Sequence, residues 1–217
     1  MSWHIAVVFS KIEGTLQSQS FVHLMQSSAQ DSRTVVHIWQ HILKTIKDED
    51  TSISMVYLRQ DNAGCYHSNF TILAADIIEK STGVQIKQID FSDPQGAADC
   101  LAARCKSHIR VYINEGHDVT TVDEMKAALL SHGGLEGVRV VVATSSLISC
   151  DQEHSKITSV NKLNNFQFVN GRIIAWRAYG VGKGKTVQVK SSRRGTLSCE
   201  IKLFFFCFSS FPKKEAA

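Results

Sequence analysis

The strongest constraint on the fold comes from residues 53–67, which read ISMVYLRQDNAGCYH. Apolar residues alternate along the first half of this stretch, and Asp61-Asn62-Ala63-Gly64 interrupts them before a helix-like pattern begins. The pattern predicts a buried strand, a glycine-assisted turn and a helix. Ligands in open α/β sheets gather at the carboxyl ends of strands, so Asp61 is the first candidate for chemistry. The alternative is that Asp61 and Asn62 only form the turn and cap the helix.

Strand-like and helix-like patterns alternate along the first 144 residues. An alternating apolar run over 4–25, broken by Glu13-Gly14, predicts a β-hairpin. The further predicted elements are a helix over 31–47 capped by Asp31 or Ser32, the strand before Asp61, a helix over 68–80 ended by Gly83, a strand over 84–89, a helix over 97–114, a helix opened by a Thr121–Glu124 capping box, and a strand over 138–143. This order predicts an α/β fold with a mixed, largely parallel sheet and helices on its faces.

The composition changes after residue 144. Residues 145–165 are polar, and the apolar runs on either side of Asn170-Gly171 predict a second hairpin over 166–179. A Gly/Lys loop follows, then a basic and finally an apolar tail. We therefore expect a core over 1–144, a loop and β-hairpin appendage over 145–189, and an unstructured tail over 190–217.

Composition limits the function classes only loosely. With 217 residues, 43% of them hydrophobic, the chain can bury one sizeable core. The net charge of +4 permits contact with nucleic acid without demanding it. The start MSWHIAVVFSKIEG lacks the pattern of a secretory signal, and the apolar tract 203–208 is too short to span a bilayer. We expect a nuclear or cytoplasmic protein, not secreted and not in a membrane, with reduced cysteines.

Two carboxylates are placed to share a metal ion. Asp61 ends one predicted strand, and Asp99 lies in the first turn of the helix that follows the next strand. Adjacent parallel strands present their carboxyl ends side by side, so both side chains could reach one Mg²⁺ or Mn²⁺ ion. Metal ions held in this way position a nucleophile for in-line attack on a phosphodiester. The alternative for Asp99 is a favourable interaction with the helix N-terminus. For Asp90 and Asp93 we favour a role in capping the intervening turn.

Four blocks of the chain resemble one group of proteins. They are RQDNAGCYH (59–67), IDFSDPQG (89–96), KSHIRVYINEGHD (106–118) and WRAYGVGKGK (176–185). They are similar to transposon-derived animal proteins with a DDE/D transposase core, and the resemblance runs from Ile5 to about Gly184. It implies the ribonuclease-H-like fold of integrases and Mg²⁺-dependent DNA strand cleavage and transfer. It also implies that Asp61 and Asp99 are the second and third catalytic metal ligands, supported by Asn62 and His67.

The chain departs from this group in two places. The first strand of the fold, which carries the first catalytic acid, would precede the hairpin, whereas this chain begins at Met1. A Gly/Lys-rich insertion of similar proteins between Gly96 and Asp99 is missing. We therefore predict a degenerate transposase-derived protein that lacks the first strand and is catalytically inactive. The alternatives are a non-enzymatic, domesticated nucleic-acid-binding module and a non-functional fragment; the oligomeric state stays open.

Cysteine and histidine residues raise a zinc hypothesis. Cys65 and His67 stand together, as do Cys100, Cys105 and His108. Four of these five side chains could form a tetrahedral zinc site. The spacing is not that of a usual zinc finger, and Cys105 falls on the apolar face of its helix, so we do not expect zinc.

Basic residues near the end of the predicted core are candidates for DNA contacts. The sequence 180–186 (GVGKGKT) lacks the first glycine of a phosphate-binding loop, because that position is Tyr179. The residues after it alternate like a strand, so we reject nucleotide binding. Arg172, Arg177, Lys183 and Lys185 could instead contact a DNA backbone weakly and without sequence preference. The alternative is a solvated loop.

Overall fold

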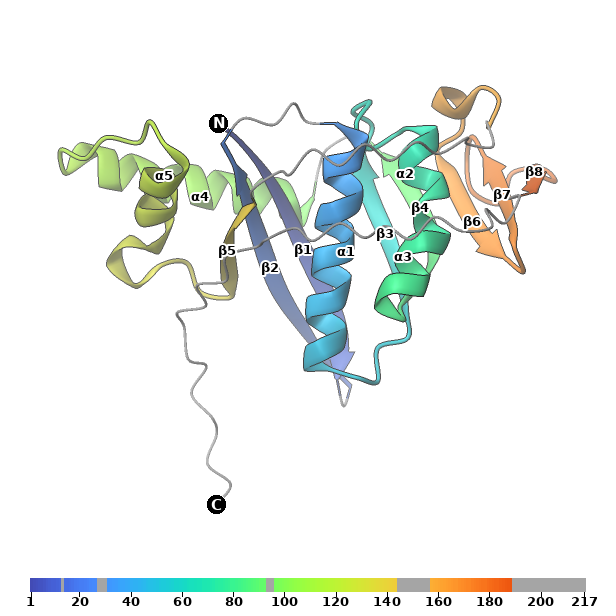
Figure 1. The fold of residues 1–217 in the computed structure, drawn as a ribbon, viewed down its shortest axis with the longest axis horizontal. Helices are drawn as coiled ribbons and strands as arrows, with labels where there is room; N and C mark the ends of the chain where they lie inside the picture. Colours follow the sequence, from blue (N-terminus) through green and yellow to red (C-terminus); the bar gives the residue numbers. More distant parts are fainter. Residues whose placement is uncertain (13, 27–30, 93–95, 144–156, 189–217) are drawn as a thin grey trace, which may run out of the picture. The chain divides into compact units, whose positions relative to one another are not determined.

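The computed structural model describes residues 1–12, 14–26, 31–92, 96–143 and 157–188. These residues form a mixed α/β fold, as predicted, and the chain divides into two compact units (Figure 1). Each unit contains its own mixed sheet, whereas the sequence predicted one. The predicted tail over 190–217 and most of the loop after residue 144 lie outside the described residues.

The first unit is built on a three-stranded sheet in the order β1-β2-β5. The predicted first hairpin is confirmed: β1 and β2 are antiparallel, and Gly14 takes a positive φ of 83° in the turn between them. The strand β5 runs parallel to β2, so that Val140 lies opposite Val22. The elements of this unit are β1 (Ser2–Ile12), β2 (Thr15–Met25), α4 (Ala97–Asn114), α5 (Val122–Leu130), η1 (Ser131–Gly133) and β5 (Val138–Ala143).

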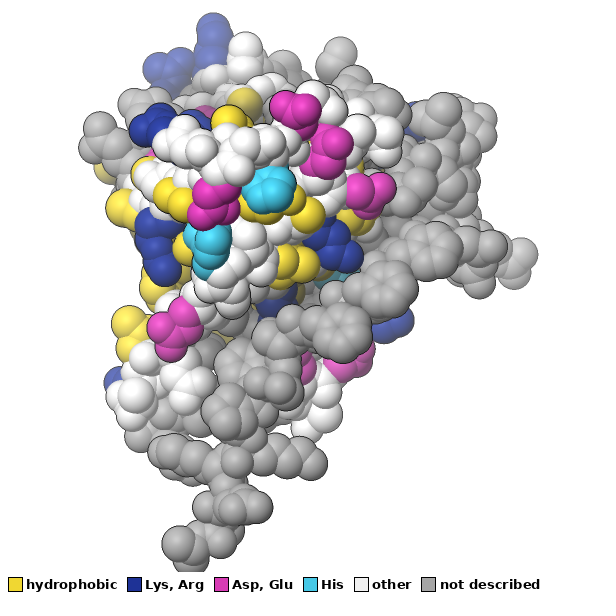
Figure 2. Space-filling model, turned by 90° about the vertical axis from the view of Figure 1, so that its left-hand side faces the viewer, with side chains coloured by type: hydrophobic (Ala, Val, Ile, Leu, Met, Phe, Trp, Pro, Cys, Tyr) yellow, Lys and Arg dark blue, Asp and Glu magenta, His cyan; other side chains and the backbone are white. Residues whose placement is uncertain are grey.

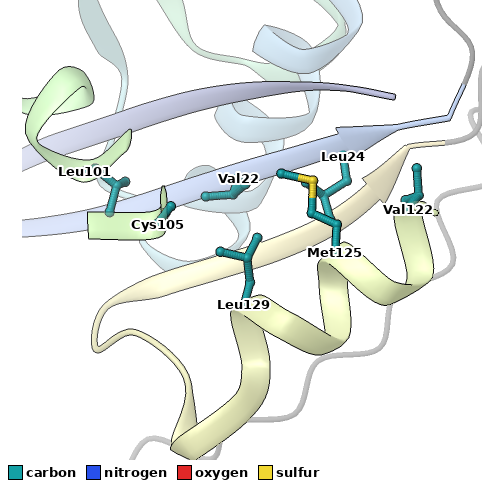
Figure 3. Packing of buried hydrophobic residues seen from close by; sticks show 7 residues of the cluster. All are labelled: Val22, Leu24, Leu101, Cys105, Val122, Met125 and Leu129. Atoms are coloured by element: carbon teal, nitrogen blue, oxygen red, sulfur yellow. The ribbon is translucent and has the colours of Figure 1, made fainter. Parts of the chain in front are cut away.

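The core of the first unit lies between its sheet and its two helices. Val22 and Leu24 of β2 meet the buried side chains of α4 and α5, and Met125 reaches toward Leu24 (Figure 3). The buried side chains that α4 and α5 contribute are Leu101, Cys105, Val122, Met125 and Leu129. The predicted capping box at Thr121 and Glu124 is present at the start of α5.

The outer surface of this unit is chemically mixed. Figure 2 looks at the side on which α4 and α5 lie, and acidic, histidine, basic and hydrophobic side chains alternate there. Val111 and Ile113 of α4 are about half exposed, at 49% and 48%, and His132 Nε2 lies 3.0 Å from the Glu115 carboxylate. The buried side of α4 therefore stops short of Ile113.

The second unit is built on a five-stranded sheet in the order β3-β4-β6-β7-β8. The strands β3 and β4 are parallel, and β4 to β8 are antiparallel neighbours. The predicted second hairpin is confirmed as β6 and β7, which turn through Asn170 and Gly171, both at positive φ. The elements are α1 (Ser32–Glu49), β3 (Met55–Asp61), α2 (Asn69–Leu73), α3 (Ala75–Thr82), β4 (Gln85–Ser92), η2 (Val160–Lys162), β6 (Asn165–Val169), β7 (Arg172–Trp176) and β8 (Lys185–Gln188).

Local signals place the helices of the second unit. Asp31 caps α1, because its side chain accepts a hydrogen bond from the Thr34 amide at 2.8 Å. The single helix predicted over 68–80 is instead two helices, α2 and α3, separated at Ala74. Gly83 ends α3 in the left-handed conformation, as predicted. The helix α3 packs on β4 and beside α1 (Figure 1).

The two faces of the five-stranded sheet differ. One face is buried and carries Ile86, Ile89, Phe91, Phe166, Ile173 and Ala175. The opposite face is polar and partly exposed, and we call it the open face; it carries Tyr57, Arg59, Gln88, Asp90, Asn165, Gln167, Ile174 and Trp176. The prediction that β3 is a buried strand is therefore wrong. It is an edge strand whose Tyr57 is 69% exposed, because every second residue points to the open face.

Candidate functional site

Asp61 is the last residue of β3, where the sequence predicted it, and its side chain is exposed. The turn after it brings Cys65 and Tyr66 close. Burial is the main cause of the raised pKa of the Tyr66 phenol, and the negative charge of Asp61 adds to it. Burial likewise raises the pKa of the Cys65 thiol, with a smaller contribution from Asp61. Both groups are therefore neutral at physiological pH, and Cys65 is a poor nucleophile.

Asn62 and His67, the predicted supports of the metal ligands, do lie together. His67 Nδ1 is 3.0 Å from the side-chain oxygen of Asn62, and Nε2 is 2.8 Å from the Leu163 carbonyl oxygen. The imidazole also stacks on Phe91. A carbonyl oxygen only accepts hydrogen bonds, so Nε2 is the donor to Leu163. His67 thus ties the turn after β3 to the segment that leads into β6, through the hydrogen bond that Nε2 donates.

Asp99 lies in the first turn of α4 and its side chain is exposed. It belongs to the first unit, whereas Asp61 belongs to the second. The sequence argument assumed that the two acids follow neighbouring strands of one sheet. The structure contains this pair of strands, because β3 and β4 are parallel neighbours in one sheet, and the helix α4 that follows β4 packs on β1 and α5. The shared Mg²⁺ or Mn²⁺ site stays a prediction.

Asp90 has a different role from the predicted turn cap. It lies inside β4, and its carboxylate accepts two hydrogen bonds from the Gln88 amide, both at 2.9 Å, and one from Asn165 at 2.6 Å. The Asn165 donor links β6 to β4 on the open face. Asp93 lies outside the described residues.

The five candidate zinc ligands are divided between the units. Cys65 and His67 belong to the second unit, and Cys100, Cys105 and His108 belong to α4 of the first. Cys105 is fully buried in the core while Cys100 is exposed, so the helix directs the two thiols differently. His108 lies with Nε2 3.0 Å from the Ser131 carbonyl oxygen. Within the described parts of the chain, no three His, Cys, Asp or Glu side chains are grouped so that they could hold a metal ion.

The candidate DNA-contacting residues lie close together along one acid-free segment. Arg172 begins β7, Arg177 and Lys183 lie in the loop between β7 and β8, and Lys185 begins β8. All four are exposed, and Lys185 donates a hydrogen bond to the Thr158 carbonyl at 2.9 Å. Lys162 of η2, which the sequence interpretation missed, is a fifth exposed cation of this segment.

The charge of this segment is unusual for the chain. Residues 157–188 hold five of the 24 Lys and Arg residues and none of the 20 Asp and Glu residues. The remainder of the chain is consequently close to neutral. A count of acidic residues along the sequence would have found this feature.

The Gly/Lys loop is folded against Trp176. Gly180, Gly182 and Gly184 all have positive φ, and the indole Nε1 is 3.4 Å from the Gly182 carbonyl oxygen. A Cβ atom at Gly184 would lie 2.6 Å from that indole nitrogen, so only glycine fits there. The loop leads into β8 and not into a helix, which confirms the predicted strand and removes the helix N-terminus that a phosphate-binding loop uses.

Comparison of the chain with protein-family models, with curated proteins and with solved structures found no match. None of the helices that the structure describes is long and apolar enough to cross a membrane.

Proposed function

We propose that this protein is a nucleic-acid-binding module of transposase ancestry that has lost metal-dependent strand cleavage. The ancestry rests on the four sequence blocks, and the order of hairpin, helix, strand, helix, strand and helix is in keeping with it. The observation that carries the binding function is the acid-free, cationic segment 157–188.

The segment suits a phosphate backbone. Its five cations are exposed, and they are carried by η2, β7, β8 and the loop before β8. Lysine and arginine side chains that contact phosphates fix the position of a nucleic acid without reading its sequence. Each neutralised phosphate releases counterions, so that binding weakens steeply with salt. The rigid packing of the loop around Trp176 fixes the backbone that carries Lys183, which lowers the conformational entropy lost on binding.

The loss of catalysis is supported by the distribution of the acids. Strand transfer by two metal ions needs several carboxylates at one point. Among the described residues, no three His, Cys, Asp or Glu side chains are grouped so that they could hold a metal ion, and Asp90 accepts hydrogen bonds from Gln88 and Asn165. A non-enzymatic module therefore accounts for the described residues with fewer assumptions than an enzyme does.

The binding function is tested with the full chain and a fluorescein-labelled DNA, by fluorescence anisotropy over a range of salt concentrations. We expect the double variant Arg172→Gln/Lys183→Gln to bind at least about ten-fold more weakly at low salt and to lower the slope of log K against log salt by about 2. The matched control is Lys106→Gln/Arg110→Gln, which removes two exposed cations from α4 and should leave binding unchanged. Equal losses in both variants, or no binding at low salt, would contradict the proposal.

The loss of catalysis needs a separate test. Calorimetric titration with Mn²⁺ and a nicking assay on supercoiled plasmid compare the unmodified chain with Asp61→Asn. We expect no nicking in either protein and the same Mn²⁺ heats. Nicking that disappears in Asp61→Asn would show that the metal site has survived.

A further inference from the structure

The open face of the five-stranded sheet carries side chains in two rows. Register pairing places Tyr57 opposite Gln88, Gln88 opposite Gln167, and Gln167 opposite Ile174. Residues opposite one another in adjacent strands project from the same face. The first row therefore runs from the edge strand β3 across the sheet to β7.

The second row lies beside the first. Arg59 is opposite Asp90, Asp90 opposite Asn165, and Asn165 opposite Trp176. Asp90 accepts its hydrogen bonds from Gln88 and Asn165, so its carboxylate oxygens have donors within the face. This carboxylate fixes the two amides, which leaves their remaining polar atoms to an incoming ligand.

Aromatic rings lie at both ends of these rows. Tyr57 is 69% exposed at the β3 end. At the β7 end, Trp176 and Tyr179 pack edge to face with centroids 5.3 Å apart, and Tyr179 is 53% exposed. Exposed aromatic rings of this size are unusual on a polar sheet face, since burial of such a ring is favourable.

We propose that the nucleic acid bound by this protein is single-stranded, and that its bases stack on Tyr57 and Tyr179 across the open face. This inference rests on the proposed function and adds the class of nucleic acid. Unpaired bases stack on aromatic side chains regardless of sequence, whereas the bases of a duplex are already stacked on one another.

The dimensions and charge of the face agree with this ligand. The row from β3 to β7 crosses three strand spacings, about 14 Å, comparable to the four-stranded sheets on which RNA-binding domains stack two or three bases. Arg59 lies on the face itself, with its Nε donating to the Ser92 hydroxyl at 3.0 Å. Arg172 and Lys183 follow at the β7–β8 end, so that phosphates of a strand lying along the rows meet cations at both ends.

The test measures binding of an oligothymidine of about 12 nucleotides and of the matching duplex by anisotropy. We expect the single strand to bind at least about ten-fold more tightly than the duplex. Tyr57→Leu and Tyr179→Leu should each weaken single-strand binding about ten-fold and leave duplex binding unchanged. Tyr57→Phe and Tyr179→Phe keep the rings and should keep the affinity.

The control is Phe9→Leu, which removes an exposed ring, 57% accessible, from the sheet of the other unit. Circular dichroism melting checks that each variant is folded. Equal affinity for single strand and duplex, with no effect of the tyrosine variants, overturns this inference and leaves the proposed function intact. Equal binding of polyglutamate to the unmodified chain also overturns it, because charge alone would then account for the affinity. Absence of binding to either nucleic acid overturns both proposals.

Discussion

The imidazole of His67 lies flat against the ring of Phe91, with centroids 4.1 Å apart and planes inclined by 11°. Phe91 in turn meets Phe166 edge to face at 5.8 Å. The histidine therefore closes one end of the apolar layer between β4 and β6. Its two nitrogens meanwhile contact Asn62 and the Leu163 carbonyl.

His67→Ala should destabilise the protein by about 2–3 kcal/mol, because it removes the ring contact and both polar contacts. The urea midpoint, followed by circular dichroism, measures this change. The control is His117→Ala: His117 stacks on Tyr112 with nearly the same geometry, at 4.2 Å and 18°, but on an exposed part of the first unit. We expect its effect to stay within about 0.5 kcal/mol. Similar midpoints for the two variants would show that His67 has no linking role.

Gly184→Ala should disrupt the Gly/Lys loop. The new methyl group would lie 2.6–2.8 Å from atoms of Trp176 and Ile174, at a backbone φ of 69°. We expect a loss of about 3 kcal/mol, of which the left-handed conformation accounts for about 1. Gly182→Ala has a similar φ of 73° but open space around it, so it should show only the conformational part. Hydrogen exchange at β7 and β8 amides and the urea midpoint together separate the two effects; equal losses would refute the close contact.

Folding of the first unit should weaken in mild acid because of His4. This residue is 7% exposed and lies opposite His23, with ring centroids 6.1 Å apart. Burial lowers its pKa from 6.5 to about 4, so the unfolded chain binds a proton at a higher pH than the folded chain does.

Stability should therefore fall as the pH drops from 6.5 to about 4, with a total loss near 3 kcal/mol from His4. Urea unfolding at pH 7.0, 5.5 and 4.5 measures the slope. His4→Leu has no titrating ring and should flatten the profile over this range. A slope that persists unchanged in His4→Leu would assign the effect to other groups.

The capping box of α5 gives a prediction for a single hydroxyl group. Thr121 accepts a hydrogen bond from the Glu124 amide at 3.2 Å, and Glu124 accepts from the amides of Thr120 and Thr121. Thr121→Ala should cost about 1 kcal/mol, while Thr121→Ser keeps the acceptor and should cost much less. Helicity and the urea midpoint report the difference, and equal behaviour of the two variants would exclude the cap as its source.

The same capping box predicts how stability depends on pH in the acid range. The hydrogen bonds from Thr120 lower the pKa of Glu124 to about 2. Because the folded pKa is depressed, the contribution of Glu124 to stability is complete above its ordinary pKa of 4.5 and is lost as the pH falls toward 2. NMR titration of the Glu124 side chain should show its midpoint well below 4.5.

The positions of helices and strands could be predicted because each depends on nearby residues. The Asn170-Gly171 turn, the Gly83 helix end and the Thr121 capping box are local chemistry, and all three are present. The division into two sheets could not be predicted, because strand partners are chosen by contacts far apart in sequence. β5 pairs with β2 and not with β4, and nothing in the pattern of β5 distinguishes the two partners.

The candidate site was predicted unevenly for the same reason. Asp61 was correctly placed at the end of its strand, and Asn62 and His67 were correctly grouped, because the three lie within seven residues of one another in sequence. The exposure of Tyr57 and the bonding of Asp90 to Asn165 were missed, since both depend on which strand becomes the edge of the sheet and which one joins β4. The prediction that Asp61 and Asp99 share a metal ion depended on the parallel pairing of β3 and β4, which the structure contains, and on the course of the chain after β4, which no local pattern fixes.

The order of the units along the chain has a consequence for biosynthesis. The first unit begins the chain, the second follows, the first resumes with α4, and the second resumes with η2. Ser20 pairs with Val138, and Asp90 pairs with Asn165. During synthesis, both sheets therefore lack a strand until these later residues have left the ribosome. Neither sheet can be completed until most of the polypeptide has emerged, and apolar strand edges stay exposed throughout that interval. Such a nascent chain depends on chaperones more than a protein whose domains are synthesised one after the other.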